Sequence, residues 1–184
     1  MKNFFKIAFV FLLIAIMFLF FIRYFEIDKY IARKLYPKTY IEYVLEASQK
    51  YDVDENLIFA IIKNESNFKN SISSNKGAQG LMQLMETTAL DVAETIGLSN
   101  IDLSDPKTNI EIGTKYYCYL YNRYQNKELA LAAYNAGSGN VDKWIASGNL
   151  EADGSNIENI PFKETNMYVR KVLQTEKIYK FLYY

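Results

Sequence analysis

Glu65 lies on the apolar face of a predicted helix, where burial of a charged side chain costs free energy. Residues 60–68, AIIKNESNF, indicate an amphipathic helix. At about 100° per residue from Leu57, Glu65 falls at about 80°, inside an apolar arc. That arc holds Ile58, Ile61, Ile62 and Phe68, and the opposite side holds Lys63 and Asn67. The carboxyl is therefore predicted to point inward, unless the helix ends before it or an ion pair neutralises it.

An inward carboxyl group suggests acid–base chemistry. Burial of an ionised carboxylate costs several kcal/mol, and the usual response is a pKa raised to about 6 or more. Cleavage of a glycosidic bond needs a protonated acid near neutral pH, because the leaving oxygen must receive a proton. Glu65 is thus suited to general-acid catalysis, although periodicity alone does not assign that role.

Two later segments add polar side chains among small or apolar ones. Gln83 follows a short glycine-bearing loop, NKGAQGLMQL (75–84). Tyr134 and Asn135 end an alanine-rich helical pattern, where small side chains let a backbone or a sugar ring approach closely. Each also has a structural interpretation. Gln83 would be a satisfied amide, and Asn135 would cap a tightly packed helix.

Composition excludes several classes of protein. The 184 residues contain no histidine, which removes Ser-His-Asp and Cys-His catalysis and imidazole-bound metals. The formal net charge is zero, so a nucleic-acid partner is not expected. Cys118 is the single cysteine, so no internal disulfide can form, and its aromatic surroundings predict a small core residue.

The N-terminus indicates a membrane segment. An unbroken apolar run extends from Ile7 to Ile22, close to the length of about 20 residues that spans a bilayer. No small-residue cleavage site follows it, which favours an uncleaved signal anchor. Positive residues lie on both sides of the run, and a simple count would place the following domain in the cytoplasm.

Helical patterns fill the remainder of the chain. A mixed-charge stretch from Arg23 to Lys38, closed by Pro37, precedes a helix capped by Thr39. Asp54 is predicted to cap the helix that carries Glu65, and Asp105 with Pro106 to begin a long helix. The expected helices are 39–50, one that starts at Asp54 and carries Glu65, then 86–96, 106–124, 127–136, 139–147 and 164–182, with polar loops at 70–80 and 148–161. The prediction is an all-α domain with irregular connections.

Five segments in order resemble the soluble-lytic-transglycosylase-type (SLT) family of peptidoglycan lyases. They are Glu65-Ser66 with Phe68, then GAQGLMQLM (77–85), Asp105-Pro106 with Asn109-Ile110 and Gly113, AAYNAG (132–137) with Gly139, and Glu164-Thr165 with Tyr168-Val169. Asn70 and Glu86 stand where the family often has proline. The resemblance implies a compact, goose-type lysozyme-like multi-helix domain at 39–184. A transmembrane anchor at 1–24 and a juxtamembrane stalk at 25–38 precede it.

The resemblance also implies site roles. Glu65 corresponds to the single catalytic acid and base. The implied substrate-binding residues are Ser66, Met82, Gln83, Ala133, Tyr134, Asn135 and Tyr168. No metal and no cofactor are implied. Asp52, Asp54, Glu86, Asp91 and Glu94 could each supply a second carboxylate, but their expected places are caps and exposed turns.

The family's reaction cleaves the β-1,4 bond between N-acetylmuramic acid and N-acetylglucosamine and leaves a 1,6-anhydromuramyl end. The expected partners are peptidoglycan strands and the plasma membrane. Because peptidoglycan lies outside that membrane, the domain is expected on the cell-wall side, and long domains translocate largely regardless of flanking charge. Two alternatives stay open at this point: a goose-type hydrolase, and a non-catalytic cell-wall-binding scaffold.

Overall fold

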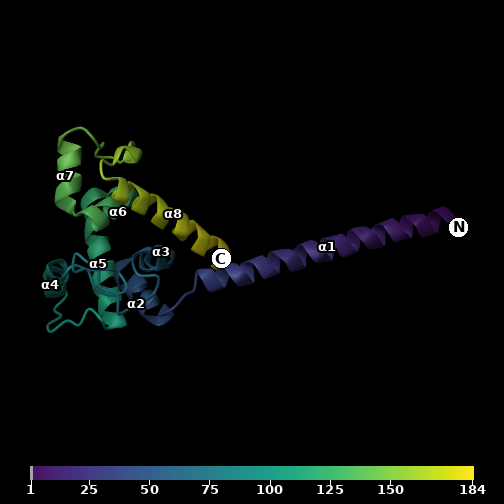
Figure 1. The fold of residues 1–184 in the computed structure, drawn as a ribbon, viewed down its shortest axis with the longest axis horizontal. Coiled ribbons are helices and arrows are strands. Elements are labelled where there is room, and N and C mark those ends of the chain that lie inside the picture. Colours follow the sequence, from purple (N-terminus) through teal and green to yellow (C-terminus); the bar gives the residue numbers. More distant parts are fainter. Residues whose placement is uncertain (1) are drawn as a thin grey trace. The chain divides into compact units, whose positions relative to one another are not determined.

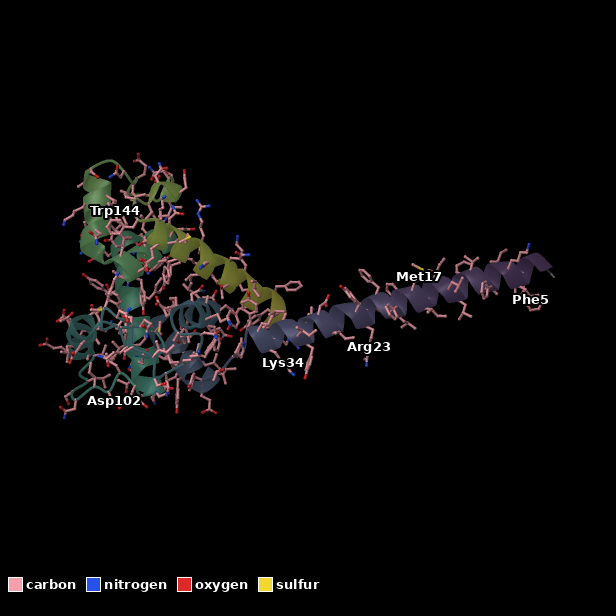
Figure 2. All side chains as sticks on the ribbon, viewed as in Figure 1. Phe5, Met17, Arg23, Lys34, Asp102 and Trp144 are labelled. Atoms are coloured by element: carbon pink, nitrogen blue, oxygen red, sulfur yellow. The ribbon has the colours of Figure 1, made fainter. Side chains whose placement is uncertain are left out.

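The computed structural model describes the backbone of residues 2–184 and the side chains of residues 4–24 and 27–184. These residues form two compact units, which divide after Pro37. The first contains the helix α1 (Lys2–Leu35), whose apolar side chains, such as Phe5 and Met17, stand out around the helix (Figures 1 and 2). Among the described residues, the segment Phe4–Leu35 of α1 is the one helix with the length and composition to cross a membrane.

The second unit is helical, as predicted. It contains α2 (Ile41–Tyr51), α3 (Glu55–Glu65), α4 (Glu86–Thr95), α5 (Pro106–Tyr124), α6 (Lys127–Ala136), α7 (Ser138–Ala146), the short 3₁₀ helix η1 (Ile157–Asn159) and α8 (Lys163–Tyr183) (Figure 1). Within residues 2–184 there is no β-strand. Two isolated bridges, Ser73 with Gln79 and Gln79 with Leu84, shape the loop before α4.

Side-chain caps set two of the predicted helix starts. The Asp54 carboxylate accepts from the backbone N–H of Asn56, and that of Asp105 accepts from the N–H of Thr108, with Pro106 following. The prediction for Thr39 is wrong. The residue before α2 is Tyr40, which has a φ of 61° and gives the helix no side-chain cap. No side-chain capping bond therefore marks the start of α2.

Helix α3 is the buried centre of the domain. Every residue from Asn56 to Ile62 is buried, and α3 lies against α8, where the rings of Phe59 and Tyr179 stack with centroids 5.5 Å apart. A helix apolar on all sides is expected to be enclosed on all sides. Glu65 is the last residue of α3. The backbone of the most buried helix therefore positions its carboxyl group.

Charged residues fasten the first turn of α3. Lys180 of α8 bridges Asp54 at 2.7 Å and Glu176 at 2.8 Å, and Lys127 of α6 also pairs with Glu176 at 2.8 Å. At the chain entry, the Lys38 ammonium pairs with Glu55 at 2.9 Å. Three helices are thus connected around the start of α3, far along the helix from Glu65.

Cys118 differs from its prediction as a core residue. It is half-buried on α5 and lines a cavity of about 430 Å³ together with Tyr51, Tyr117 and Lys127. Its neighbour in sequence, Tyr117, takes the core position and is 3% exposed. The core position in this aromatic run therefore belongs to Tyr117 and not to Cys118.

Candidate active site

The end of α3 presents Glu65 directly. The helix continues through Glu65, and Ser66 closes it, with its N–H donating to the carbonyl of Ile62 at 3.0 Å. Asn67 and Phe68 then take left-handed φ values of 51° and 64°, which reverse the chain. The alternative in which the helix ends before Glu65 is thereby excluded. Phe68 lies outside the helix, so its expected helical position was wrong, although its ring lies 6.4 Å from that of Phe59.

The environment of Glu65 favours the protonated acid. The side chain is half-buried, and burial raises its pKa from 4.5 to about 7. No ion pair with Glu65 occurs among the described side chains, so the buried-pair alternative has no support. The predicted polar side of the helix is less exposed than expected, because Lys63 is half-buried and burial lowers its pKa. Glu65 is therefore an inward-facing carboxyl group without a cationic partner among the described side chains.

Two tyrosines interact electrostatically with this carboxyl group. The Tyr168 hydroxyl on α8 is buried, and among the described residues no atom completes a hydrogen bond of ordinary geometry to it. It nevertheless interacts with Glu65 and moves the pKa of Glu65 part of the way back down. Tyr134 of α6 donates its hydroxyl to the carbonyl of Met82 at 2.8 Å. Burial, with the nearby Glu65 charge, raises the pKa of both tyrosines well above 10.

The loop before α4 is held in place from inside. The carboxamide oxygen of Asn109 accepts from the N–H of Met82 at 2.8 Å, and its nitrogen donates to Gln79 O and Leu103 O. Gly80 leaves room for this contact, since an added Cβ would lie 2.1 Å from the Asn109 amide nitrogen. Gly113 leaves similar room for Met82, because its Cβ would lie 2.5 Å from the Met82 sulfur. The glycines therefore permit close packing.

The predicted site residues divide into a half-buried set and a buried set. Met82 and Ala133 are fully buried, and Ser66 is 3% exposed with its hydroxyl bonded to the carbonyl of Ile62. Gln83 is half-buried and donates to Ile72 O and Gly80 O, as its structural interpretation expected. Half-buried Asn135 accepts from the Thr165 hydroxyl at 2.8 Å. Of the predicted residues, Tyr134 and Tyr168 are the two whose pKa values the Glu65 charge affects.

The candidate second carboxylates lie in other environments. Asp54 caps the opposite end of α3 and pairs with Lys180, and Asp52, Glu86 and Glu94 are exposed. Asp91 is exposed as well and lines a cavity on the α4–α5 side. Burial and Tyr168 alone account for the shifted pKa of Glu65. Nor does any group of three His, Cys, Asp or Glu side chains suited to a metal ion occur in the described part of the chain.

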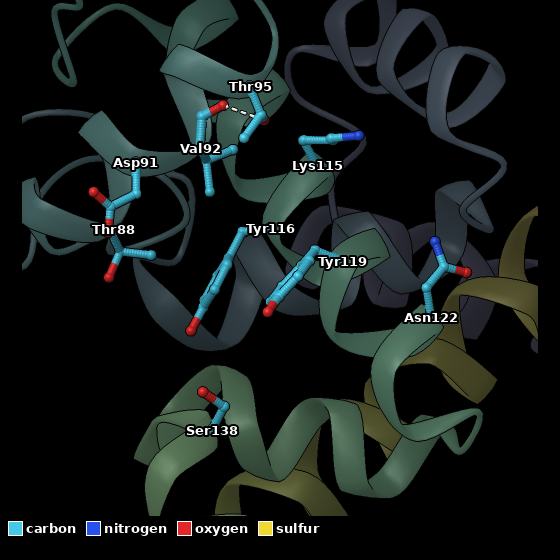
Figure 3. Close-up of a pocket in the computed structure, with 9 residues that line it drawn as sticks. All are labelled: Thr88, Asp91, Val92, Thr95, Lys115, Tyr116, Tyr119, Asn122 and Ser138. Atoms are coloured by element: carbon cyan, nitrogen blue, oxygen red, sulfur yellow. Dashed lines mark hydrogen bonds between the residues drawn. The ribbon is translucent and has the colours of Figure 1, made fainter.

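Sequence reasoning missed a cavity of about 510 Å³ between α4 and α5. Tyr116 and Tyr119 of α5 form one wall, with their rings side by side and both hydroxyls toward Ser138, as Figure 3 shows. The Tyr116 ring lies 5.3 Å from that of Tyr134, so the cavity is one ring pair from the residues around Glu65. The spacing i, i+3 in the tyrosine-rich run could have indicated a shared face. Asn109 and Thr165 were within matched segments but had been given no role.

Comparisons with known proteins agree with this geometry. Residues 42–156 match the family described as Transglycosylase SLT domain. A "Soluble lytic murein transglycosylase" of Salmonella typhimurium is 34% identical over 152 residues, covering 79% of this chain and 23% of the relative. A "Membrane-bound lytic murein transglycosylase C" of Edwardsiella ictaluri is 36% identical over 166 residues, covering 77% and 46%. The chain thus spans less than half the length of either relative.

A solved structure shares the fold. The inactive glutamate-to-glutamine mutant of the lytic transglycosylase Slt from Pseudomonas aeruginosa superposes with a TM-score of 0.71 at 32% identity, covering 80% of this chain and 25% of that one. The predicted lysozyme-like helical class is therefore confirmed. The family match covers more than half of the 184 residues. This chain belongs to the Transglycosylase SLT domain family.

Proposed function

We propose that the domain is a peptidoglycan lytic transglycosylase in which Glu65 is the single general acid and base. The observation that carries the proposal is the pKa of about 7 at a half-buried carboxyl with no ion pair among the described residues. At neutral pH such a group exists in both protonation states in comparable amounts. It can therefore donate a proton in one step and accept one in the next.

The reaction needs one proton to move twice. Glu65 donates its proton to the glycosidic oxygen as the bond from the muramyl C1 to that oxygen breaks, and the N-acetylglucosamine side leaves as an alcohol. The 2-acetamido group of the substrate stabilises the positive charge at C1. The Glu65 carboxylate then removes the proton of the muramyl 6-hydroxyl, whose oxygen bonds to C1. No water is consumed, and Glu65 ends protonated as it began.

The electrostatics of Glu65 support this route, because no second acid among the described residues contributes to the shift of its pKa. Hydrolases that invert or retain at C1 place two carboxyl groups about 5 to 9.5 Å apart. Here the pKa of Glu65 shows the influence of burial and Tyr168 but of no other acid. A substrate that stabilises its own cation removes the need for that second group.

Tyrosine rings and amides provide the proposed walls of the saccharide groove. Tyr134, Tyr168, Gln83 and Asn135 keep their predicted role as substrate contacts. Ser66, Met82 and Ala133 are enclosed, and we assign them to support those walls. The Tyr116 and Tyr119 rings extend the groove toward α4, where their faces can pack on the apolar face of a sugar.

The proposed location is the plasma membrane, with residues 38–184 on the cell-wall side. The length and apolar composition of α1 support an anchor, and one relative is named as membrane-bound. Protease added to intact spheroplasts is expected to cut the domain. Protection of the domain there would reverse the proposed topology.

Product analysis tests the chemistry. Purified sacculi incubated with the wild-type protein are expected to release muropeptides that end in 1,6-anhydro groups, one water lighter than hydrolysed ends in mass spectrometry. Glu65→Gln is expected to lower the rate about 10²- to 10⁴-fold, the usual contribution of a general acid. Glu86→Gln, an exposed carboxyl in the first turn of α4, is the matched control and is expected to keep full activity.

Each other outcome identifies a rival. Hydrolysed ends would establish a goose-type hydrolase on the same scaffold. Full activity in Glu65→Gln would remove Glu65 from the acid role. If the wild-type protein bound sacculi and released nothing, the domain would be a wall-binding scaffold.

A further inference from the structure

Helix α1 continues well past its apolar run. The run ends at Ile22 and the helix ends at Leu35, which leaves 13 helical residues beyond it. At about 1.5 Å per residue, this extension is about 20 Å long. Its composition changes from wholly apolar to mixed, with Arg23, Asp28, Lys29, Arg33 and Lys34 among its members. In the proposed topology, the extension lies in water.

A narrow apolar stripe runs along this extension. Tyr24, Ile27, Ile31 and Leu35 follow one another at spacings of 3, 4 and 4, and each side chain is between 51% and 60% exposed. At 100° per residue the stripe covers about 80° of the helix surface, narrower than the face of about 100° or more that packs on a protein core. A seam of this width is typical of two helices that pack along their length.

The spacing of the stripe continues that of the preceding segment. Counting back from Ile31 by alternating steps of 4 and 3 gives Ile27, Tyr24, Phe20, Met17, Leu13 and Val10, all apolar. Every residue of the apolar run is apolar, so any spacing would select apolar residues there. Only the sequence after Ile22 therefore distinguishes one register from another. There, Arg23 and Asp28 border the seam, Lys34 takes the position three residues after Ile31, and Lys29 and Arg33 lie on the opposite side.

Those flanking charges are opposite in sign. With Tyr24 and Ile27 at the a and d positions of a heptad, Arg23 is a g position and Asp28 the following e position. In a parallel pair of helices, g of one helix faces that e of the other. Neither Arg23 nor Asp28 forms an ion pair within the described part of the chain. The charges at these two flanking positions are therefore complementary between two parallel copies.

A membrane surface fits this stripe poorly. Laying it on the bilayer would require α1 to bend near Arg23, but the helix is unbroken from Lys2 to Leu35 and contains neither glycine nor proline. Helices that lie in the interface carry a broad apolar face and mainly basic flanks. Here the face is narrow and Asp28 borders it.

We propose that α1 forms a parallel, two-stranded coiled coil with a second copy of this chain, through a seam of Tyr24, Ile27 and Ile31 flanked by Arg23–Asp28 pairs between the copies. The parallel orientation rests on the proposed anchor, since both copies enter the membrane the same way. Confinement to the membrane raises the effective concentration of the two helices. Each dimer carries two catalytic domains on the same side of the membrane.

Cysteine cross-linking in native membranes tests the seam. Because Cys118 is the single native cysteine, Cys118→Ser gives a cysteine-free full-length protein. Ile27→Cys and Ile31→Cys in that background are expected to form covalent dimers under mild oxidation at least tenfold faster than Lys29→Cys, which lies on the outer side. Equal rates at the three positions, or no dimer at 27 and 31, would overturn the proposal. The readout does not depend on enzyme activity.

Charge reversal tests the partner and its orientation. In the Ile31→Cys protein, Arg23→Asp is expected to slow cross-linking severalfold, because it places two acids against Asp28 of the other copy. Adding Asp28→Arg is expected to restore the rate. A double variant as slow as the single one would show that these residues do not meet across an interface between copies. Because release of anhydro ends is assayed separately, a failed seam leaves the proposed reaction unaffected, and the reverse holds too.

Discussion

The two ends of α3 each carry an acid, and the fold treats them in opposite ways. Burial alone would raise the pKa of Asp54 at the first end, but hydrogen bonds from Lys180 and Asn56 outweigh it and lower that pKa. At the other end, burial raises the pKa of Glu65 to about 7, and Tyr168 offsets only part of the rise. One carboxylate is held charged and the other is held ready to carry a proton.

Helix polarity adds to this difference. The N-terminus of a helix stabilises negative charge and the C-terminus disfavours it. Asp54 sits at the favourable end and caps free N–H groups, whereas Glu65 sits at the unfavourable end with no cation beside it among the described residues. A structural acid and a chemical acid therefore differ in placement and partners, although their side chains are nearly the same. Four experiments can break or sharpen this comparison.

The largest expected effect is on the pH dependence of activity. Above pH 7 the protonated fraction of Glu65 falls about tenfold per pH unit, so the rate at pH 9 is expected to be about 100-fold below its maximum. The release of anhydro ends from sacculi between pH 5 and 9 measures this, with circular dichroism as a control for folding. A rate that stays constant to pH 9 would show that Glu65 titrates elsewhere.

Substitutions at the two ends are expected to change stability in opposite directions. The raised pKa of Glu65 means that its contribution to stability is complete below about pH 4.5 and is lost as pH rises through about 7. Glu65→Gln is therefore expected to stabilise the protein by about 1–3 kcal/mol at pH 8 and little at pH 4. Urea unfolding of the detergent-solubilised chain measures both values.

Asp54→Ala provides the other half of that test. It removes a cap and an ion pair, and we expect a loss of about 1–2 kcal/mol at pH 7. Its activity per folded molecule is expected to stay unchanged. If both substitutions changed the free energy of unfolding in the same direction, the two ends of α3 would not differ as described.

Removal of the Tyr168 hydroxyl is expected to have a smaller effect. Because its interaction lowers the pKa of Glu65, Tyr168→Phe is expected to move the alkaline fall in activity upward by up to about one pH unit. Tyr117→Phe is a matched control, since Tyr117 is also buried but does not affect the pKa of Glu65. A downward shift would mean that Tyr168 stabilises the protonated acid instead.

The smallest expected effect comes from Lys180, which bridges Asp54 and Glu176. Its side chain is 47% exposed, so Lys180→Met is expected to cost about 1 kcal/mol. Removing the cation raises the pKa of Asp54, so the difference is expected to shrink as the pH falls through the acid range. Lys177→Met, exposed on the same helix, is the control and is expected to be neutral. A large loss of activity in Lys180→Met would show that the ion pairs at the Asp54 end of α3 influence Glu65 at the other end.

Local chemistry predicted most of the helices and the direction of Glu65. The caps at Asp54 and Asp105 were correct because each depends on residues two or three positions away. The predicted bounds for 106–124 and 127–136 match α5 and α6 for the same reason. The division of the chain into a segment at 1–24, a stalk at 25–38 and a domain from 39 remains a prediction, beside a structure in which α1 is one continuous helix.

Contacts between distant segments were beyond the sequence. The amide of Asn109 holds Met82 from 27 residues away, and Gly113 makes room for the same side chain. Neither relation has a periodic signature. The cavity beside Tyr116 was missed because it forms only when α4 packs on α5. Side chains that help to shape a site across such distances need coordinates to be found.

The reversal of the chain at Asn67 and Phe68 has a consequence for variation in this protein. Two successive non-glycine residues adopt left-handed backbone angles, and Phe68 folds back toward Phe59 of the helix that it has just left. The turn that follows Glu65 is therefore completed within three residues and returns the chain to α3. A substitution at Asn67 or Phe68 is therefore expected to displace the carboxyl group of Glu65, although neither side chain belongs to the predicted site.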